Sequence, residues 1–327
     1  MKLLLISTNR HTLPMPVMPI GVCLVAEAAE RAGHSVHLLD LMFTRDALSD
    51  IAATITRVKP DVVGLSVRNI DNNDMRDTVF FLDDLKSMVK MIRDRTDALI
   101  VLGGAALGVM PEEILRLAAV SCGVLGDGET VFPLLLEHIA QNRSFSDIPG
   151  IAYIEDGIFR QNACLASGFS DKCLAPDYPR WVNVAAYQTQ MATVSIQTKI
   201  GCQFQCVYCT YRKIEGSAYR LSEPENVVDG VMRLAAAGLR DIEFVDSVFN
   251  APLEHAMAMC DALARVDHKA RLQSLELNPL FVKDALITAM ERAGFVGMGI
   301  TLESASDPVL RVFKKGSPAT KYIDPPK

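Results

Sequence analysis

The sequence contains no apolar run that could cross a membrane. Its longest near-apolar stretch, LIVLGGAALGVM at residues 99–110, is shorter than the roughly 18 residues that a spanning helix needs. The opening MKLLLIS has one lysine and a very short apolar run, which is too short for a signal peptide and is typical of a first buried strand. We therefore expect a cytoplasmic protein without a membrane partner, in which the eight cysteines are thiols or metal ligands and not a disulfide framework.

The sequence is also poor in aromatic residues and has no excess of positive charge. Aromatic side chains make up 6% of the residues and hydrophobic side chains 50%, a balance that suits an α/β enzyme and argues against disorder. The formal net charge of -6 gives no electrostatic footprint for nonspecific nucleic-acid binding, so we expect no nucleic-acid partner. At roughly 100–200 residues per domain, the 327 residues predict two domains, each with its own core.

Short apolar runs and amphipathic stretches alternate over residues 1–142. For example, SVHLLD (35–40) precedes the helical period of ALSDIAATITRVK (47–59). This alternation predicts βαβ units and a doubly wound, Rossmann-like parallel sheet. Ligands of such sheets sit beyond the carboxyl ends of the strands. The loops of interest are therefore STNRHTLPMP, SVRNIDNND, GGAALG and GDGE.

Residues 143–191 do not continue the alternation of short apolar runs and amphipathic stretches, which predicts a linker between two domains. Within it, GIAYIEDGIFRQ (150–161) predicts a small hairpin with Asp156 and Gly157 at its turn. From residue 192 the alternation of strands and helices resumes, which predicts a second parallel α/β domain at 192–327. Its expected strands are ATVSIQTK (192–199), DIEFVD (241–246), LQSLELN (272–278) and GMGITLE (297–303).

Three cysteines lie within eight positions in IGCQFQCVYCTY, and no fourth cysteine or histidine is nearby. Cys202, Cys206 and Cys209 follow an expected strand, whereas Cys23, Cys122, Cys164, Cys173 and Cys260 are isolated in sequence. Structural zinc sites use four protein ligands, so three thiolates predict either a catalytic zinc with an open position or an iron–sulfur cluster with one iron left free. An open position on a metal can bind and polarise a substrate.

The C-x3-C-x2-C spacing, with Tyr208 before the last cysteine, resembles the signature of the radical S-adenosylmethionine superfamily. The resemblance implies a [4Fe–4S] cluster in a β/α barrel, whose free iron chelates S-adenosylmethionine and whose electron releases a 5′-deoxyadenosyl radical. IEFVDSVFN (242–250) and TLESASDPVLRVFKKG (301–316) are similar to later barrel segments of the family. By position Asp246, Asn250 and Glu303 are candidates, with Tyr208, to contact S-adenosylmethionine, although each could instead cap the following helix.

Residues 1–142 resemble the cobalamin-binding domain that is fused to many radical enzymes of this superfamily. The resemblance is carried by Pro16, PIG (19–21), AEAAERAGHSVHLLD, GLSVRNIDNN and GGAALGVMPEEIL with GVLGDGE. It implies that cobalamin contacts the loops after the strands. The alternatives are that the polar residues of these loops only face solvent and that the glycines only form turns. The candidate residues are Ser66, Arg68, Asn69, Asp71, Gly103, Gly104, Gly126 and Gly128.

Two motifs are absent from the amino-terminal domain. No G-x-G-x-x-G follows the first strand, which disfavours a dinucleotide site. No D-x-H-x-x-G occurs either, so we expect cobalamin to bind without a histidine below the cobalt. His11 is predicted to be a surface residue, and His34 and His37 are predicted to be structural.

The chain ends in KKGSPATKYIDPPK, which is Pro-rich and lacks apolar periodicity. Four barrel strands are predicted after residue 192 where the family has about six, so we expect a fragment, a frame-shifted product or a partial barrel that another chain completes. The resemblance implies methyl transfer to an unactivated carbon, with one S-adenosylmethionine methylating cobalt and a second supplying the radical.

The alternatives are a cobalamin-dependent radical cyclase or rearrangement enzyme, and a truncated, noncatalytic cofactor-binding remnant. A methylthiotransferase is disfavoured because it would need a second set of three cysteines in the amino-terminal domain. We expect a small-molecule or peptide substrate, and an electron donor such as flavodoxin or ferredoxin.

Overall fold

The computed structural model describes residues 1–164, 175–301 and 303–315, which form two compact units. The first unit holds the described residues within Met1–Leu165 and Pro176–Ala192, and the second holds those from Thr193 onward with Ala175. Each unit has its own sheet and its own buried core, as the length predicts.

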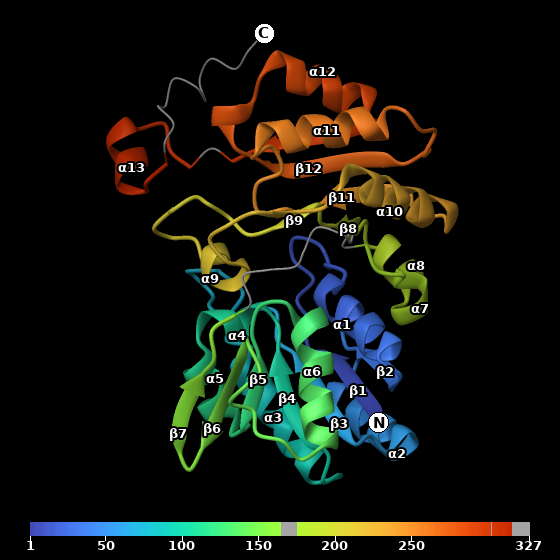
Figure 1. Ribbon diagram of the computed structural model, residues 1–327, viewed down its shortest axis with the longest axis vertical. Helices are drawn as coiled ribbons and strands as arrows, with labels where there is room; N and C mark the ends of the chain where they lie inside the picture. The colour runs from blue at the N-terminus through green and yellow to red at the C-terminus, as the bar shows by residue number, and fades with distance from the viewer. Residues whose placement is uncertain (165–174, 302, 316–327) are drawn as a thin grey trace. The chain divides into compact units, whose positions relative to one another are not determined.

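The first unit is built on a seven-stranded sheet of order β2-β1-β3-β4-β5-β6-β7 (Figure 1). Strands β1 to β5 are parallel, and β6 and β7 add antiparallel to the edge at β5. The chain order reverses between β1 and β3, where ligands bind in open α/β sheets. The strands are β1 (Lys2–Ser7), β2 (Ser35–Asp40), β3 (Val62–Ser66), β4 (Leu99–Gly103), β5 (Cys122–Val124), β6 (Ile151–Glu155) and β7 (Ile158–Gln161).

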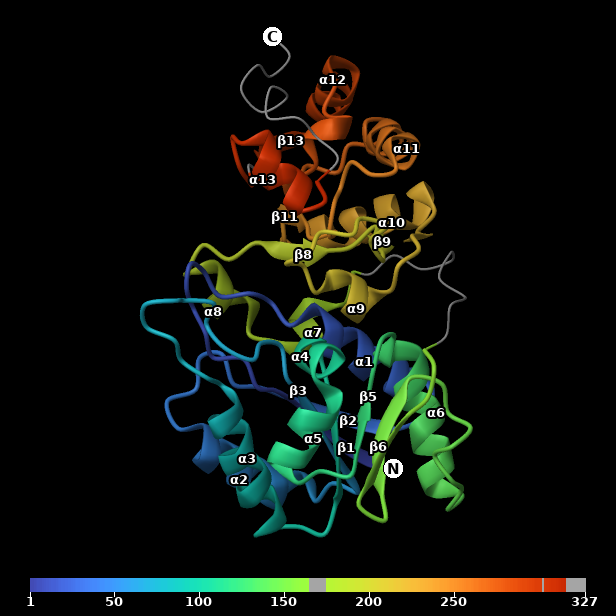
Figure 2. The same cartoon turned by 90° about the vertical axis from the view of Figure 1, so that its left-hand side faces the viewer.

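Helices cover this sheet in two layers, because the connections between parallel strands pass over opposite faces. One layer contains α1 and α6, which pack together, and the other contains α2, α3 and α5 (Figures 1 and 2). The helices are α1 (Ile20–Arg31), α2 (Ala47–Val58), α3 (Leu82–Arg93), α4 (Ala105–Val109), α5 (Pro111–Ala118), α6 (Gly128–Ala140), α7 (Tyr178–Trp181) and α8 (Val184–Gln188).

Two local features of the first unit differ from the sequence reading. The stretch TVFFLDDLKSMVKMIRDR (78–95) has a helical period from residue 78, yet helix α3 begins at Leu82, because Asp71 forms a β-bridge with Phe80 and the Asn72 side chain accepts from the Val79 N–H. The hairpin at 150–161 forms with Asp156 and Gly157 at its turn, as expected. It belongs to the first sheet, however, so the segment treated above as a linker contributes two strands to that unit.

The second unit contains a four-stranded parallel sheet of order β13-β12-β11-β8 and a two-stranded antiparallel ribbon of β9 and β10. The four parallel strands are those predicted from the sequence. They are β8 (Val194–Ile196), β11 (Asp241–Phe244), β12 (Arg271–Leu277) and β13 (Phe295–Ile300); the ribbon is β9 (Lys199–Ile200) and β10 (Arg220–Leu221).

Helices α10, α11 and α12 pack in a row against this sheet (Figure 1). Their apolar faces bury Val231, Met259 and Met290, and the rings of Phe244, Phe249 and Phe295 stack in the core with centroids 5.3 to 5.4 Å apart. The helical segments are α9 (Tyr211–Glu215), α10 (Pro224–Ala236), α11 (Leu253–Leu263), η1 (Pro279–Phe281), α12 (Asp284–Arg292) and α13 (Asp307–Val312).

Candidate functional site

The three clustered cysteines lie in one loop between β9 and α9, residues 201–209, which we call the cysteine loop. Cys202 is buried and its N–H donates to Gly216 O at 3.1 Å, while Cys206 and Cys209 are half-buried. The Cys209 N–H donates to Cys206 O at 3.2 Å, so these two residues share one tight turn. All three are free thiols.

Gly201 starts the cysteine loop, and its backbone requires glycine. Its φ is +98°, and a Cβ atom there would overlap the carbonyl oxygen of Ala218. The Gly201 N–H donates to the Glu215 carboxylate at 3.2 Å, which ties the start of the loop to the end of α9.

The thiols of the cysteine loop are close enough to influence one another. Burial raises the pKa of Cys209, and the neighbouring Cys202 and Cys206 raise it further, whereas a hydrogen bond from the Tyr211 N–H lowers it. Within the described part of the chain, no three His, Cys, Asp or Glu side chains are placed to hold a single metal ion. In a [4Fe–4S] cluster each cysteine would bind a different iron, so the three thiols need not converge on one point.

Asp246 lies at the end of β11 and is fully buried. One carboxylate oxygen accepts from the Thr198 N–H at 2.7 Å, and the other accepts from the Thr198 hydroxyl at 2.6 Å and from Lys199 Nζ at 3.2 Å. Lys199 is also fully buried, and its Nζ donates to Phe249 O at 2.9 Å. Asp246 therefore anchors the strand that leads into the cysteine loop, and both of its oxygens are already engaged.

Asn250 is also buried and makes a reciprocal pair with the backbone of Asn278. Its amide nitrogen donates to Asn278 O at 2.9 Å and its oxygen accepts from the Asn278 N–H at 2.8 Å. This pair joins the ends of β11 and β12. Asn250 does not cap the following helix, because the N-cap residue of α11 is Pro252.

Tyr208 and Glu303 come together, although 94 residues separate them in the sequence. Glu303 forms an ion pair with Lys315 at 2.9 Å, and the Lys315 ammonium lies 5.7 Å from the Tyr208 ring centroid. Burial raises the pKa of Glu303, but hydrogen bonds from Lys315 and Tyr208 lower it overall. The three side chains thus form one polar group beside the cysteine loop.

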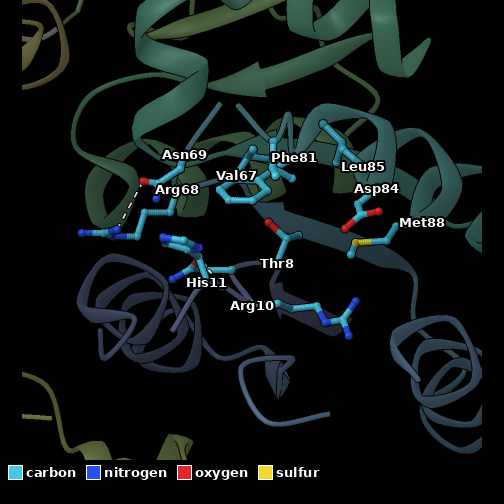
Figure 3. Close-up of a pocket in the computed structure, with 12 residues that line it drawn as sticks. Thr8, Arg10, His11, Val67, Arg68, Asn69, Phe81, Asp84, Leu85 and Met88 are labelled. Carbon is cyan, nitrogen blue, oxygen red and sulfur yellow. Dashed lines mark hydrogen bonds between the residues drawn. The ribbon is translucent and has the colours of Figure 1, made fainter. Parts of the chain in front are cut away.

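The first unit has a cavity of about 270 Å³ at the carboxyl edge of β1 and β3 (Figure 3). The buried Asn9 Nδ2 lines it without a hydrogen-bond partner, and the His11 ring packs on Phe81 with centroids 5.5 Å apart. Arg68 donates to the Asn69 side chain at 3.2 Å. The cavity is lined by Thr8, Asn9, Arg10, His11, Val67, Arg68, Asn69, Val79, Phe81, Asp84, Leu85 and Met88.

The other cobalamin candidates lie outside this lining. Ser66 ends β3, where its carbonyl accepts from the Thr8 N–H and hydroxyl, and Asp71 caps a turn by accepting from the Asn73 N–H. A Cβ atom at Gly104 would lie 2.5 Å from Val67 O, so this glycine lets the ends of β3 and β4 approach. The remaining three, Gly103, Gly126 and Gly128, lie at the end of β4, in the turn after β5 and at the start of α6.

Two protein families match the chain. The B12 binding domain family matches residues 6–136, and the Radical SAM superfamily matches residues 196–324. The chain is a radical SAM protein with a B12-binding domain. Both parts of the resemblance drawn from the sequence are therefore confirmed, as is the fold class.

Relatives of this radical SAM protein are curated methyltransferases. It is 23% identical to the tryptophan 2-C-methyltransferase of Streptomyces laurentii, over 97% of this chain and 62% of that protein. It is 25% identical to the hopanoid C-3 methylase of Methylococcus capsulatus, over 76% of this chain and 45% of that protein. The chain thus spans about half to two thirds of the length of these two relatives.

A solved structure supports the same grouping. The radical S-adenosylmethionine methyltransferase TsrM from Kitasatospora setae, with cobalamin and a [4Fe–4S] cluster bound, superposes with a TM-score of 0.87 at 26% identity, over 97% of this chain and 64% of that chain. The cobalamin-dependent radical enzyme OxsB has the same fold, with a TM-score of 0.80 at 17% identity, over 98% of this chain and 46% of that chain.

The residues of this radical SAM protein fit the cofactors of the two families. Three free thiols in one loop match a cluster that takes three cysteines, and the unpartnered Asn9 amide at the cavity is a donor for a polar ligand. A cavity of about 270 Å³ is near the lower end of ordinary small-ligand sites, so it would enclose only part of a cobalamin. Along the described chain, no helix has the length and apolar character to span a membrane.

Sequence reasoning missed several residues that the structure brings to these sites. His11 was expected on the surface, yet it lines the cavity with Asn9. Lys199 sits in an apolar strand, and a lysine within VSIQTKI is a signal that could have drawn attention to a buried ion pair. Lys315 gave no signal, because its partners are brought near it only by folding.

Proposed function

We propose that this chain carries the cofactor sites of a cobalamin-dependent radical S-adenosylmethionine methyltransferase acting on an unactivated carbon. The observation that carries the proposal is the cysteine loop, in which three free thiols lie within eight residues and two of them share one tight turn. When bound, the cluster supplies an electron to cleave S-adenosylmethionine, and cobalamin supplies a carrier for the methyl group.

The second domain, residues 192–327, is proposed to hold the cluster and S-adenosylmethionine. Cys202, Cys206 and Cys209 would ligate three irons as thiolates. Tyr208 and Glu303 would contact S-adenosylmethionine, because their polar atoms lie beside the cysteine loop and one edge of Tyr208 is exposed. Asp246 and Asn250, also predicted from their position to contact S-adenosylmethionine, make buried hydrogen bonds to Thr198 and Asn278 and are proposed to hold the loops of this site in place.

The first domain, residues 1–142, is proposed to bind cobalamin over the carboxyl edge of its sheet. Within residues 143–191, the hairpin at 150–161 extends this sheet, and residues 176–191 also belong to the first unit. Arg68, Asn69 and Asn9 line the cavity and offer donors to a carbonyl or phosphate oxygen. Ser66, Asp71, Gly103, Gly104, Gly126 and Gly128 would shape the surrounding loops. His11 lacks the D-x-H-x-x-G setting, so we retain the proposal that no histidine binds cobalt from below.

A methylthiotransferase fits less well. Such an enzyme would need a second set of three clustered cysteines. In the described part of the first unit Cys23 and Cys122 are buried, and the exposed Cys164 is far from both in sequence. Burial raises the pKa of Cys122 to about 12 and that of Cys23 well above its usual value. An electron donor such as flavodoxin or ferredoxin is proposed as the partner, because cleavage needs one electron from outside the chain.

The test is anaerobic reconstitution of the whole chain with iron, sulfide and hydroxocobalamin, followed by a reductant and S-adenosylmethionine. We expect 5′-deoxyadenosine and S-adenosylhomocysteine, both detected by mass spectrometry. Cys206→Ala should abolish the former, whereas Cys260→Ala, which removes a buried thiol in α11, should retain it. A cluster that forms without any cleavage would contradict the proposal and favour a noncatalytic remnant. A product heavier by one methylene would distinguish methylation from cyclisation.

A further inference from the structure

Lys315 makes contacts with two separate residues beside the cysteine loop. Its ammonium lies 2.9 Å from Glu303 Oε1, and the side chains of both residues are only 17% exposed. It also hydrogen-bonds the Tyr208 hydroxyl, which itself bonds Glu303. The three polar groups therefore close a triangle in which each member contacts the other two.

The backbone around Lys315 is attached to the same loop. The Val207 N–H donates to Phe313 O at 3.3 Å, and the Phe313 ring meets the Tyr208 ring edge to face with centroids 5.3 Å apart. The Lys315 N–H donates to Leu310 O at 2.9 Å, which folds the chain back after α13. The residue that follows α13 is thus held against Val207 and Tyr208 of the cysteine loop.

We propose that Lys315 is a positioning residue that holds Tyr208 and Glu303 in place and keeps a positive charge beside the cluster. The inference rests on the proposed function and adds a residue that the sequence did not indicate. The Lys315 ammonium lies 5.7 Å from the ring centroid of Tyr208, which stands between Cys206 and Cys209 in the sequence. A cation near an iron–sulfur cluster stabilises its reduced form, because reduction adds negative charge.

An ordinary surface ion pair is the alternative, and such pairs contribute little. Three features separate Lys315 from that case: its low exposure, its two hydrogen-bonded partners, and the aromatic ring next to its ammonium. Charge-assisted hydrogen bonds that are shielded from water hold their partners more firmly than exposed ones. The neighbouring Lys314 is exposed and provides a matched control.

The experiment compares K315M, K315R and K314M in the reconstituted whole chain. Iron and sulfide content are measured first. An electron paramagnetic resonance titration then gives the reduction potential, and equilibrium dialysis gives the affinity for S-adenosylmethionine. We expect K315M to retain its iron, to have a more negative potential than wild type, and to bind S-adenosylmethionine about tenfold more weakly, as for the loss of one charge-assisted hydrogen bond. K315R should restore most of the reduction potential and most of the affinity for S-adenosylmethionine, and K314M should match wild type in both quantities.

Tyr208→Phe removes the hydroxyl that bonds Lys315 and Glu303 and that is proposed to contact S-adenosylmethionine, but it keeps the ring and both charges. It should weaken S-adenosylmethionine binding without moving the potential. The proposal is overturned if K315M and K314M have the same potential and affinity. If K315M loses its iron, K315Q is measured in its place, and a potential and an affinity equal to those of K314M overturn the proposal as well.

The outcomes also separate this inference from the proposed function. The potential and the affinity are measured without turnover, so a wild-type protein that forms no 5′-deoxyadenosine contradicts the methyltransferase proposal and leaves the Lys315 comparison readable. Conversely, a wild-type protein that cleaves S-adenosylmethionine while K315M matches K314M contradicts the role of Lys315 alone.

Discussion

Glu215 is a carboxylate that the second unit holds in a largely buried position next to the start of the cysteine loop. It accepts from the Gly201 N–H at 3.2 Å and from the Gln197 amide at 3.3 Å. Burial, with a smaller contribution from the charge of Asp246, raises the pKa of Glu215 to about 7, although the Gly201 hydrogen bond and Arg220 act to lower it. The folded state therefore binds a proton that the unfolded chain releases near its ordinary pKa of 4.5.

The stability of the protein should fall as pH rises through the window from 4.5 to 7, since the folded state holds more protons there. Glu215→Gln removes this slope and should make the variant more stable than wild type at pH 8, by about 1–3 kcal/mol. Urea unfolding followed by circular dichroism from pH 5 to 8 measures it. The exposed Glu291→Gln is the control, and parallel slopes in all three proteins would refute the assignment to Glu215.

The buried pair of Lys199 and Asp246 makes a second prediction about single residues. Lys199→Met leaves the Asp246 charge buried without its cation, which should lower the free energy of unfolding by about 3–5 kcal/mol. The double variant Lys199→Met with Asp246→Asn should regain a large part of this loss. Lys269→Met is the control, because its ion pair with Asp267 is exposed and should contribute less than about 1 kcal/mol. A double variant no more stable than the single one would contradict the assignment.

At the scale of elements, α7 and α8 come late in the chain and yet are held on the first unit. Tyr187 in α8 donates to Asp40 at the end of β2 at 2.6 Å, and the Asp177 N–H donates to the Glu27 carboxylate of α1 at 2.6 Å. Burial raises the pKa of Asp40, while the Tyr187 hydroxyl lowers it. The hydrogen bond from Tyr187 replaces part of the hydration that Asp40 loses on folding.

Tyr187→Phe should lower the free energy of unfolding of the first unit by about 1–3 kcal/mol, because it leaves a buried carboxylate with one hydrogen bond fewer. The fluorescence of Trp181, the only tryptophan in the sequence, reports this unfolding from the adjacent helix α7. Gln190→Ala changes an exposed side chain in the same segment and should have little effect. Equal midpoints for the two variants would mean that the Asp40 contact does not hold α8.

At the scale of the whole molecule, the chain has two units, and a different cofactor is proposed to bind to each. Hydroxocobalamin at about 100 times its dissociation constant should stabilise the first unit by about 2.7 kcal/mol, because only the folded unit binds it. The urea midpoint reported by Trp181 should rise accordingly, and removal of iron should leave that midpoint in place. A Trp181 midpoint that ignores hydroxocobalamin would contradict cobalamin binding by the first unit.

Much of the fold could be read from the sequence because its signals are local. Periodicity placed β1, β2 and α2 almost to the residue, and the Asp156-Gly157 turn placed the hairpin. The spacing of Cys202, Cys206 and Cys209 likewise predicts the proposed cluster site, since thiols close in sequence lie in one loop of the fold. The pairing of the hairpin with β5 was not readable, because strand partners are selected by distant chain segments.

The sequence by itself determined which chemistry this protein can hold: three thiolates in one loop, and strand-end loops suited to a large polar ligand. Only the tertiary structure decided which neighbouring side chains serve that chemistry. It turned Asp246 inward to Lys199, brought His11 to the cavity and set Lys315 against Glu303 and Tyr208. The physical reason is that a ligand motif depends on residues a few positions apart, whereas burial and ion pairing depend on segments that meet only when the sheet and its helices pack.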